Sequence, residues 1–209
     1  MGTDEAAELI AELREERSDR AGEEQFTNRA ALLIAAMAAT LAIGGLGGGN
    51  ATDDMLVSNI RASDTWAFYQ AKNIRQTAYE IEADELAARL SAAAPEQRAS
   101  LEERLGNYRS TIARYDDEPD PAAPADPLRG EGKKQLMAQA RDFEAQRDAA
   151  AARDDNFDYA EVLLQLALVL GSVAILAHNR TVLVASAALG ALGALLTVNG
   201  FLLLFALPF

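Results

Sequence analysis

Two long stretches of this chain contain almost no ionisable side chains, and this separation limits the folds open to it. Residues 30–50 carry none, and residues 162–209 carry only His178 and Arg180. The charged residues, 24% of the chain, therefore gather in the remaining segments. Alternation of apolar and charged segments on this scale is typical of a membrane protein.

Three apolar segments have the length of a transmembrane helix. The first covers residues 29–50, and its roughly 20 apolar residues match a hydrocarbon core of about 30 Å. The second covers residues 159–178 and the third residues 181–207, with only a short turn between them, which predicts an antiparallel hairpin. Backbone polar groups in lipid need partners within their own segment, so we expect these runs to be helical.

Residues 1–28 form an acidic, amphipathic segment ahead of the first span. A secretory signal is the alternative interpretation, but such signals begin with basic residues, and this segment is rich in Asp and Glu. Arg29 and Arg180 border the membrane on the same side, which favours a cytoplasmic amino terminus. The expected location is a bacterial inner membrane, with the segment between the first two spans and the carboxyl terminus in the periplasm.

Residues 51–158 are predicted to form a helical coiled-coil arm. Apolar residues recur there at alternating intervals of four and three, which is the heptad spacing of helices that pack on each other. A break at Ala94-Pro95 separates two runs, and proline suits the first turn of a new helix. The third run has no stop signal before the second span, so we expect one helix to continue into it. The runs are Ile60, Ala67, Ala71, Ile74, Ala78 and Ile81; then Leu101, Leu105, Tyr108, Ile112 and Tyr115; then Leu136, Ala140, Phe143, Ala150 and Phe157.

Residues 116–132 interrupt the arm with a composition that breaks helices. This segment holds four of the six prolines of the chain, and it ends in Gly130 and Gly132, so it is predicted to be an exposed linker. A thin bundle with alanine-rich contacts buries little apolar area. We therefore expect neighbouring copies or another protein to complete the arm.

One aromatic block in the arm is a candidate partner-binding site. It contains the single tryptophan of the chain, and several of its residues lie off the first heptad run on a second helix face. Packing against the other arm helices and contact with lipid headgroups are the alternatives. The candidate residues are Trp66, Phe68, Tyr69, Gln70, Lys72 and Asn73.

Polar and small residues inside the spans form two further candidate groups. Glu161, Gln165 and Asn199 are costly in lipid, so they predict either a path for a proton or ion, or hydrogen bonds between helices. Small residues at four-residue spacing allow helices to approach closely, although alanine-rich spans also produce such spacing by chance. These helix-packing candidates are Gly44, Gly48, Ser186, Gly190 and Ala194.

Several classes of function are disfavoured by the residues present. A net charge of −13 argues against a nucleic-acid partner, and a chain without cysteine has no thiolate nucleophile or thiolate metal site. No nucleophile elbow, phosphate-binding glycine loop or metal-ligand spacing occurs. We therefore expect no enzyme activity, no cofactor and no metal; the expected partners are the lipid bilayer and either further copies of the chain or the subunits of a membrane complex.

The segment Arg61-Ala62-Ser63-Asp64-Thr65-Trp66-Ala67-Phe68-Tyr69-Gln70-Ala71-Lys72 resembles the signature block of the bacterial "domain of unknown function 4337" proteins. The family is similar in its layout of an acidic tail, one span, a helical arm and a closing pair of spans. The turn between that pair has one arginine here, where a more basic cluster is expected. The resemblance implies an all-α membrane architecture with three transmembrane helices, and it implies no activity.

These features together predict a structural protein of the membrane. The leading hypothesis is a scaffold or accessory subunit that oligomerises, or that docks on a larger inner-membrane complex, through its arm. The alternative is a small oligomeric channel or transporter in which Glu161, Gln165 and Asn199 line the path.

Overall fold

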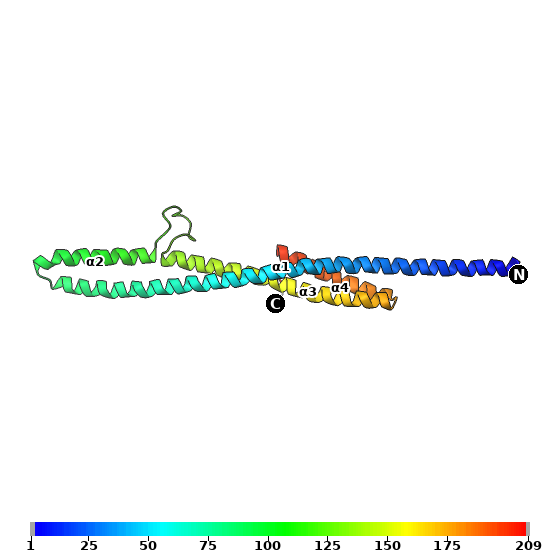
Figure 1. The fold of residues 1–209 in the computed structure, drawn as a ribbon. Helices are drawn as coiled ribbons and strands as arrows, with labels where there is room; N and C mark the ends of the chain where they lie inside the picture. Colours follow the sequence, from blue (N-terminus) through cyan, green and yellow to red (C-terminus); the bar gives the residue numbers. More distant parts are fainter. Residues whose placement is uncertain (1–2, 208–209) are drawn as a thin grey trace. The chain divides into compact units, whose positions relative to one another are not determined.

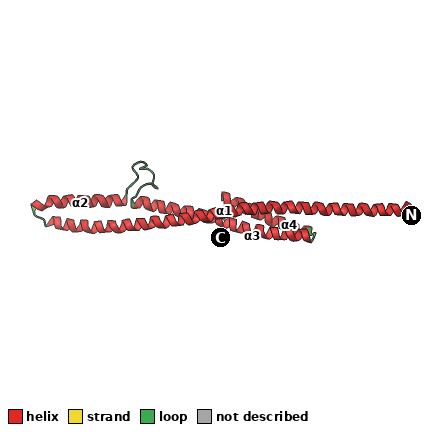
Figure 2. Cartoon of the chain, viewed as in Figure 1, coloured by secondary structure: helices red, strands yellow, loops and turns green. Residues whose placement is uncertain are grey.

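The computed structural model describes residues 3–207, and in that range the chain forms four helices and no strand. Only short turns and one longer loop connect the helices (Figure 2). The predicted all-α fold class is thereby confirmed for the described residues. The helices are α1 (Thr3–Ser91), α2 (Pro95–Asp116), α3 (Lys133–Leu176) and α4 (Arg180–Leu202).

The chain divides into two compact units. A three-helix unit comprises Met1–Thr52 and Ala151–Phe209, and the arm comprises Asp53–Ala150. Helices α1 and α3 each contribute residues to both units, and α3 is a single helix from Lys133 to Leu176, as its uninterrupted sequence indicates.

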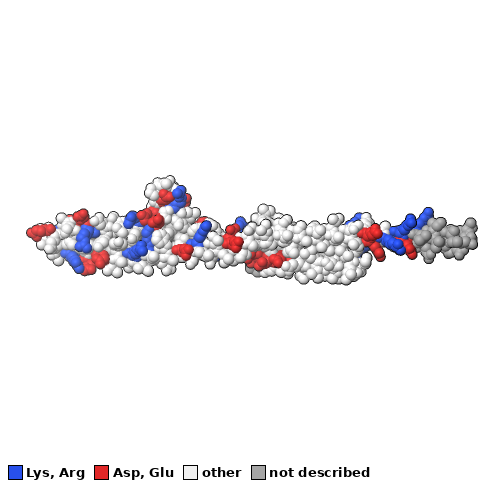
Figure 3. Space-filling model, viewed as in Figure 1, with Lys and Arg blue, Asp and Glu red and all other residues white. Residues whose placement is uncertain are grey.

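Three helices in the described part of the chain are long and apolar enough to cross a membrane. They are the α1 segment Arg20–Ser91, α3 and α4, whose most apolar windows have mean hydropathies of 2.0, 2.0 and 2.1. Figure 3 shows the corresponding surface as a stretch without Lys, Arg, Asp or Glu. The three spans expected from sequence thus correspond to three apolar helices.

Helix α4 is shorter than the predicted third span. It begins after Asn179, whose Oδ1 accepts hydrogen bonds from the backbone N–H groups of Thr181 and Val182 at 2.9 and 3.3 Å. It ends at Leu202, because Leu203 has a left-handed φ of 47° and the Asn199 side chain accepts a hydrogen bond from the Phe205 N–H at 3.1 Å. A polar side chain in the last turn therefore stops a helix that hydropathy alone extends to residue 207.

Small residues set the packing of the three-helix unit. Its core contains Met37, Leu164 and Ala167, which are at most 4% exposed. A Cβ atom added to Gly190 would lie within 3.0 Å of the Met37 Cγ, and one added to Gly193 would lie 2.7 Å from the Leu164 Cγ. Side chains at either glycine would therefore separate the helices, which approach this closely because glycine has none.

The arm is an antiparallel pairing of helices. Helices α2 and the first half of α3 lie end to end along the arm part of α1 and run in the opposite direction to it (Figure 1). The loop 117–132 projects from the arm between α2 and α3. The predicted runs of α2 and α3 lie on the packed face, where Leu105, Leu136 and Ala140 are at most 6% exposed. The predicted run of α1 is wrong as the internal seam, since Ile60, Ile74 and Ile81 are 58%, 70% and 64% exposed.

Candidate docking surface

The face of α1 that packs inside the arm follows a second heptad pattern, offset from the apolar one. Its buried residues lie three, four, seven or ten residues apart, intervals that combine the three and four of a heptad contact. Polar side chains occupy several of these positions, which is why the pattern is easily overlooked in the sequence. We call this face the inner seam; its buried residues are Ser58, Ala62, Lys72, Gln76, Ala83 and Leu86.

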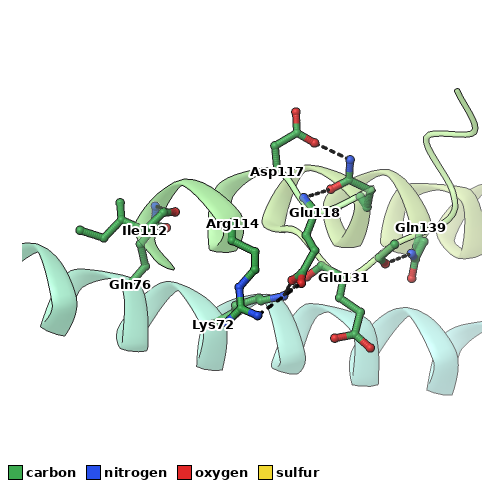
Figure 4. A network of polar contacts seen from close by, with 10 residues as sticks. Lys72, Gln76, Ile112, Arg114, Asp117, Glu118, Glu131 and Gln139 are labelled. Atoms are coloured by element: carbon green, nitrogen blue, oxygen red, sulfur yellow. Dashed lines mark hydrogen bonds and ion pairs between the residues drawn. The ribbon is translucent and has the colours of Figure 1, made fainter. Parts of the chain in front are cut away.

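Lys72 holds the loop to the inner seam. It is only 7% exposed, and its ammonium donates a hydrogen bond at 3.0 Å to the carboxylate of Glu118 and another to the backbone oxygen of Glu131 (Figure 4). These partners belong to the two ends of the loop, where Pro119 and Gly130 also form an isolated bridge. A residue predicted to meet an external partner thus binds within its own chain.

The same network fixes the two helix ends that flank the loop. Gln135 of α3 donates to the Asp117 carboxylate at 2.7 Å and accepts from the Glu118 N–H at 3.2 Å. The hydrogen bond from Gln135, followed by one from Lys134, lowers the pKa of Asp117. The segment predicted as a solvated linker is therefore a loop whose ends are pinned by specific polar contacts.

Other residues of the aromatic block also contact the arm itself. The Trp66 indole N–H donates to the Glu144 carboxylate of α3 at 2.9 Å, and its ring meets Tyr69 edge-on at 5.5 Å between centroids. The Asn73 side-chain oxygen accepts from Lys133 at 3.1 Å. Trp66, Tyr69, Lys72 and Asn73 thus have internal contacts. The Phe68 ring centroid lies 5.8 Å from the Lys72 ammonium, although Phe68 is 44% exposed, and Gln70 is also exposed.

The opposite face of α1 carries the apolar heptad run and has no partner among the described residues. Its three isoleucines are more than half exposed, and its alanines are exposed as well. Phe68 lies beside this run and widens its exposed apolar surface. We call this surface the outer stripe; it consists of Ile60, Ala67, Phe68, Ala71, Ile74, Ala78 and Ile81.

The predicted polar residues of the three-helix unit do not converge on one path. Gln165 donates to Glu161 at 2.7 Å, and both side chains lie on the exposed face of α3. Asn199 is fully buried and donates at 2.7 Å to Asn156, which is 2% exposed. Glu161 and Gln165 therefore face outward, while Asn199 takes part in a hydrogen bond between helices.

Small residues of the spans lie in close contacts within the three-helix unit, and Phe157, which the sequence placed in the third arm run, lies at the centre of one group. Ser186 is buried and donates to the Ala167 carbonyl at 2.6 Å, Gly44 faces Thr197, Gly190 faces Met37, and Ala194 is half-buried. Phe157, 4% exposed, lies against Gly47, Gly48 and Gly200, where added Cβ atoms would come within 2.6, 3.2 and 2.7 Å of it. The sequence signal for this packing was the three glycines, which leave room for the ring of one large apolar residue.

Carboxylates near the start of the predicted second span repel one another. Burial raises the pKa of Asp158, and the negative charges of Asp154, Glu161 and Asp155 raise it further. Asp154 accepts a hydrogen bond from Thr52 at 2.8 Å. The described residues contain no group of three or more His, Asp or Glu side chains placed to hold a metal ion.

A family model described as Domain of unknown function (DUF4337) matches residues 26–203, which is most of the chain. No curated protein and no solved structure matches the chain. The matched range includes the apolar stretches of all three helices and the whole arm.

Proposed function

The chain belongs to the DUF4337 family, whose description assigns no activity, and we propose that it is a membrane-anchored scaffold that docks on other protein through its arm. The three apolar helices provide the anchor. The outer stripe provides the docking surface. In this role the chain positions protein partners at a membrane and catalyses no reaction.

The outer stripe is the observation that carries this proposal. A soluble helix surface ordinarily exposes single apolar residues, not a heptad run in which Ile60, Ile74 and Ile81 are 58%, 70% and 64% exposed. Burial of one such side chain contributes about 1.5–3 kcal/mol. Because the arm carries charged residues along its length (Figure 3), we place it in water, where only protein can cover this stripe.

We further place the three spans in a bacterial inner membrane, with the amino terminus in the cytoplasm and the arm in the periplasm. This orientation rests on Arg29 and Arg180, which flank the apolar segments and would both lie on the cytoplasmic side. The alternative of a small oligomeric channel would need the outward Glu161–Gln165 pair to line a path between copies, and the buried Asn199, which bonds to Asn156, does not share that face.

Two substitutions on the stripe test the docking role. The variant Ile74→Glu/Ile81→Glu places charges on an exposed face, so it is expected to fold as the wild type does and to lose associated protein. The measurement is the mass and composition of the complex purified from its own membrane in a mild detergent. Leu128→Glu is the matched control, because Leu128 is 40% exposed on the loop, away from the stripe. A wild-type protein that is purified only as a monomer without any companion would refute the proposal.

A further inference from the structure

We propose that the outer stripe binds the outer stripe of a second copy of this chain in a parallel pair of α1 helices, and that the contact continues along the same face of α1 into its apolar segment. This inference rests on the proposed docking role and names its partner. Two copies anchored in one membrane with the same orientation direct their α1 helices the same way, so the pair must be parallel.

A second open face of α1 lies in the three-helix unit. Here α1 carries two pairs of glycines at four-residue spacing, and Gly44 and Gly48 pack against side chains of their own unit. Among the described residues, nothing outside the local helix turn lies within 4 Å of a Cβ added at Gly45 or Gly49. Small residues at this spacing let membrane helices approach closely. This second glycine pair therefore leaves room for another helix.

The open glycine pair and the outer stripe belong to one face of α1. A step of four residues stays on one helix face, and a step of seven drifts by only about 20°. Steps of these two lengths join the exposed residues of the span to those of the arm, and α1 is a single helix throughout. We call these residues the α1 line; they are Ala42, Gly49, Leu56, Ile60, Ala67, Ile74 and Ile81.

A second α1 helix matches both parts of this line. The occupant has to present small residues within the membrane and continue as an apolar helix face into the water beyond it. Every copy of the chain supplies such a helix. In a parallel pair with two-fold symmetry each residue of the line meets its own copy, so Gly49 meets Gly49 and Ile74 meets Ile74. Small or apolar side chains therefore meet at every position of the line.

The edges of the outer stripe bring no like charges together in this pair. Across parallel helices, a residue on one edge faces the residue five positions later on the opposite edge of the partner helix. Gln70 therefore faces Arg75 of the second copy, and Thr77 faces Glu82. Both contacts place a charged side chain against a neutral one, so the edges do not oppose the parallel arrangement.

Two acidic residues lie close to the line. Glu85, one turn beyond Ile81, forms an ion pair with Arg89 of its own helix, which offsets its charge. Asp64 lies within the length of the outer stripe and would approach its own copy in the pair. A single polar residue at such a position specifies register and helix number at a cost in stability. Asp64 therefore weakens the pair but favours one register.

Cysteine crosslinking tests the face and the direction, since the natural chain contains no cysteine. Ile74→Cys is expected to form a disulfide-linked dimer of the full-length protein in membranes under mild oxidation, because residue 74 meets its own copy. Glu80→Cys is the control, because Glu80 is exposed on α1 but lies away from the line. A monomer for Ile74→Cys on a denaturing gel, or equal crosslinking of the two variants, would overturn the proposal.

Gly49→Leu tests whether the contact continues in the span. A Cβ at residue 49 has open space around it, so the single chain is expected to fold while the larger side chain holds the two helices apart. Added to Ile74→Cys, it should slow crosslinking about tenfold. Ala36→Leu is the matched control, because Ala36 is exposed in the same segment but lies off the line. Equal rates for the two would overturn the shared face.

Asp64→Asn tests the register. Removal of the like charges that approach each other should speed crosslinking of the Ile74→Cys protein about twofold. Glu80→Gln removes one charge away from the line and should leave the rate unchanged; an unchanged rate for Asp64→Asn as well would overturn the register. If no dimer forms while other proteins still bind the outer stripe, this inference fails and the docking role stands.

Discussion

Lys72 of the aromatic block stabilises the arm from within. Its side chain is 7% exposed, and its ammonium binds both ends of the loop. Lys72→Met would therefore leave the Glu118 carboxylate and the Glu131 carbonyl without this donor. We expect a local destabilisation of about 2 kcal/mol. Hydrogen exchange at the Glu131 and Gly132 amides, which bond to the Glu118 carbonyl, should accelerate about 30-fold. Lys134→Met is the control; the Lys134 side chain is 69% exposed, and an equal acceleration there would contradict this role.

We expect Asp158 to make the stability of the protein depend on pH. Its pKa is raised above the ordinary 3.8 by burial and by neighbouring carboxylates, so the folded protein binds a proton more tightly than the unfolded chain. Its contribution to stability therefore falls as pH rises through the range just above 3.8. Asp158→Asn should raise the thermal midpoint at pH 7, and the gain should vanish as pH approaches 3.8. The same substitution at Asp54, in α1, should change the midpoint little; an equal gain there would contradict the assignment.

The α1 helix explains why the sequence predicted the arm but not its packed face. Two heptad patterns lie on this helix, and the more apolar one, with Ile60, Ile74 and Ile81, was the natural choice for an internal contact. The inner seam instead contains Lys72 and Gln76, whose polar groups find partners only in α2 and the loop. Such partners are distant in sequence, so no local pattern reveals that the Lys72 ammonium and the Gln76 amide nitrogen have them. The α2 and α3 runs were predictable, because in the arm the apolar residues of each of these helices follow one heptad pattern.

Glycines in α1 provide a matched test of packing in the three-helix unit. A Cβ added at Gly47 would lie 2.6 Å from the Phe157 ring and 2.9 Å from the Phe201 ring, whereas Gly45 has nothing within 4 Å. Gly47→Ala should therefore destabilise the unit by about 1–3 kcal/mol through overpacking. Gly45→Ala makes the same chemical change in the same helix and should be neutral or slightly stabilising. Thermal denaturation followed by circular dichroism in detergent measures both, and equal midpoints for the two variants would contradict the placement of Phe157.

At the scale of the whole molecule, composition alone was sufficient to predict the three apolar helices. A stretch without charged residues is visible in any sequence, and its length equals that of a membrane span. The boundary after Thr52 coincides with the end of the first apolar stretch, whereas the boundary at Ala151 precedes the charged residues 153–161. The pinned loop and the early end of α4 depend on single polar side chains, Lys72 and Asn199, and so could not be read from composition.

The proposed orientation makes a prediction for the intact cell. The chain contains no cysteine, so Ser110→Cys in the arm and Glu24→Cys before the first span each introduce a single, exposed thiol. If the arm lies in the periplasm, a thiol reagent that cannot cross the inner membrane should label Ser110→Cys in intact cells. It should label Glu24→Cys only after the membrane is opened.

Positive charge sets orientation through residues close to the spans, and here Arg29 and Arg180 lie at such boundaries. Replacing both with Gln should therefore produce a mixed population labelled at both positions. Labelling of Glu24→Cys alone in intact cells would reverse the orientation and place the outer stripe, with its partner, in the cytoplasm.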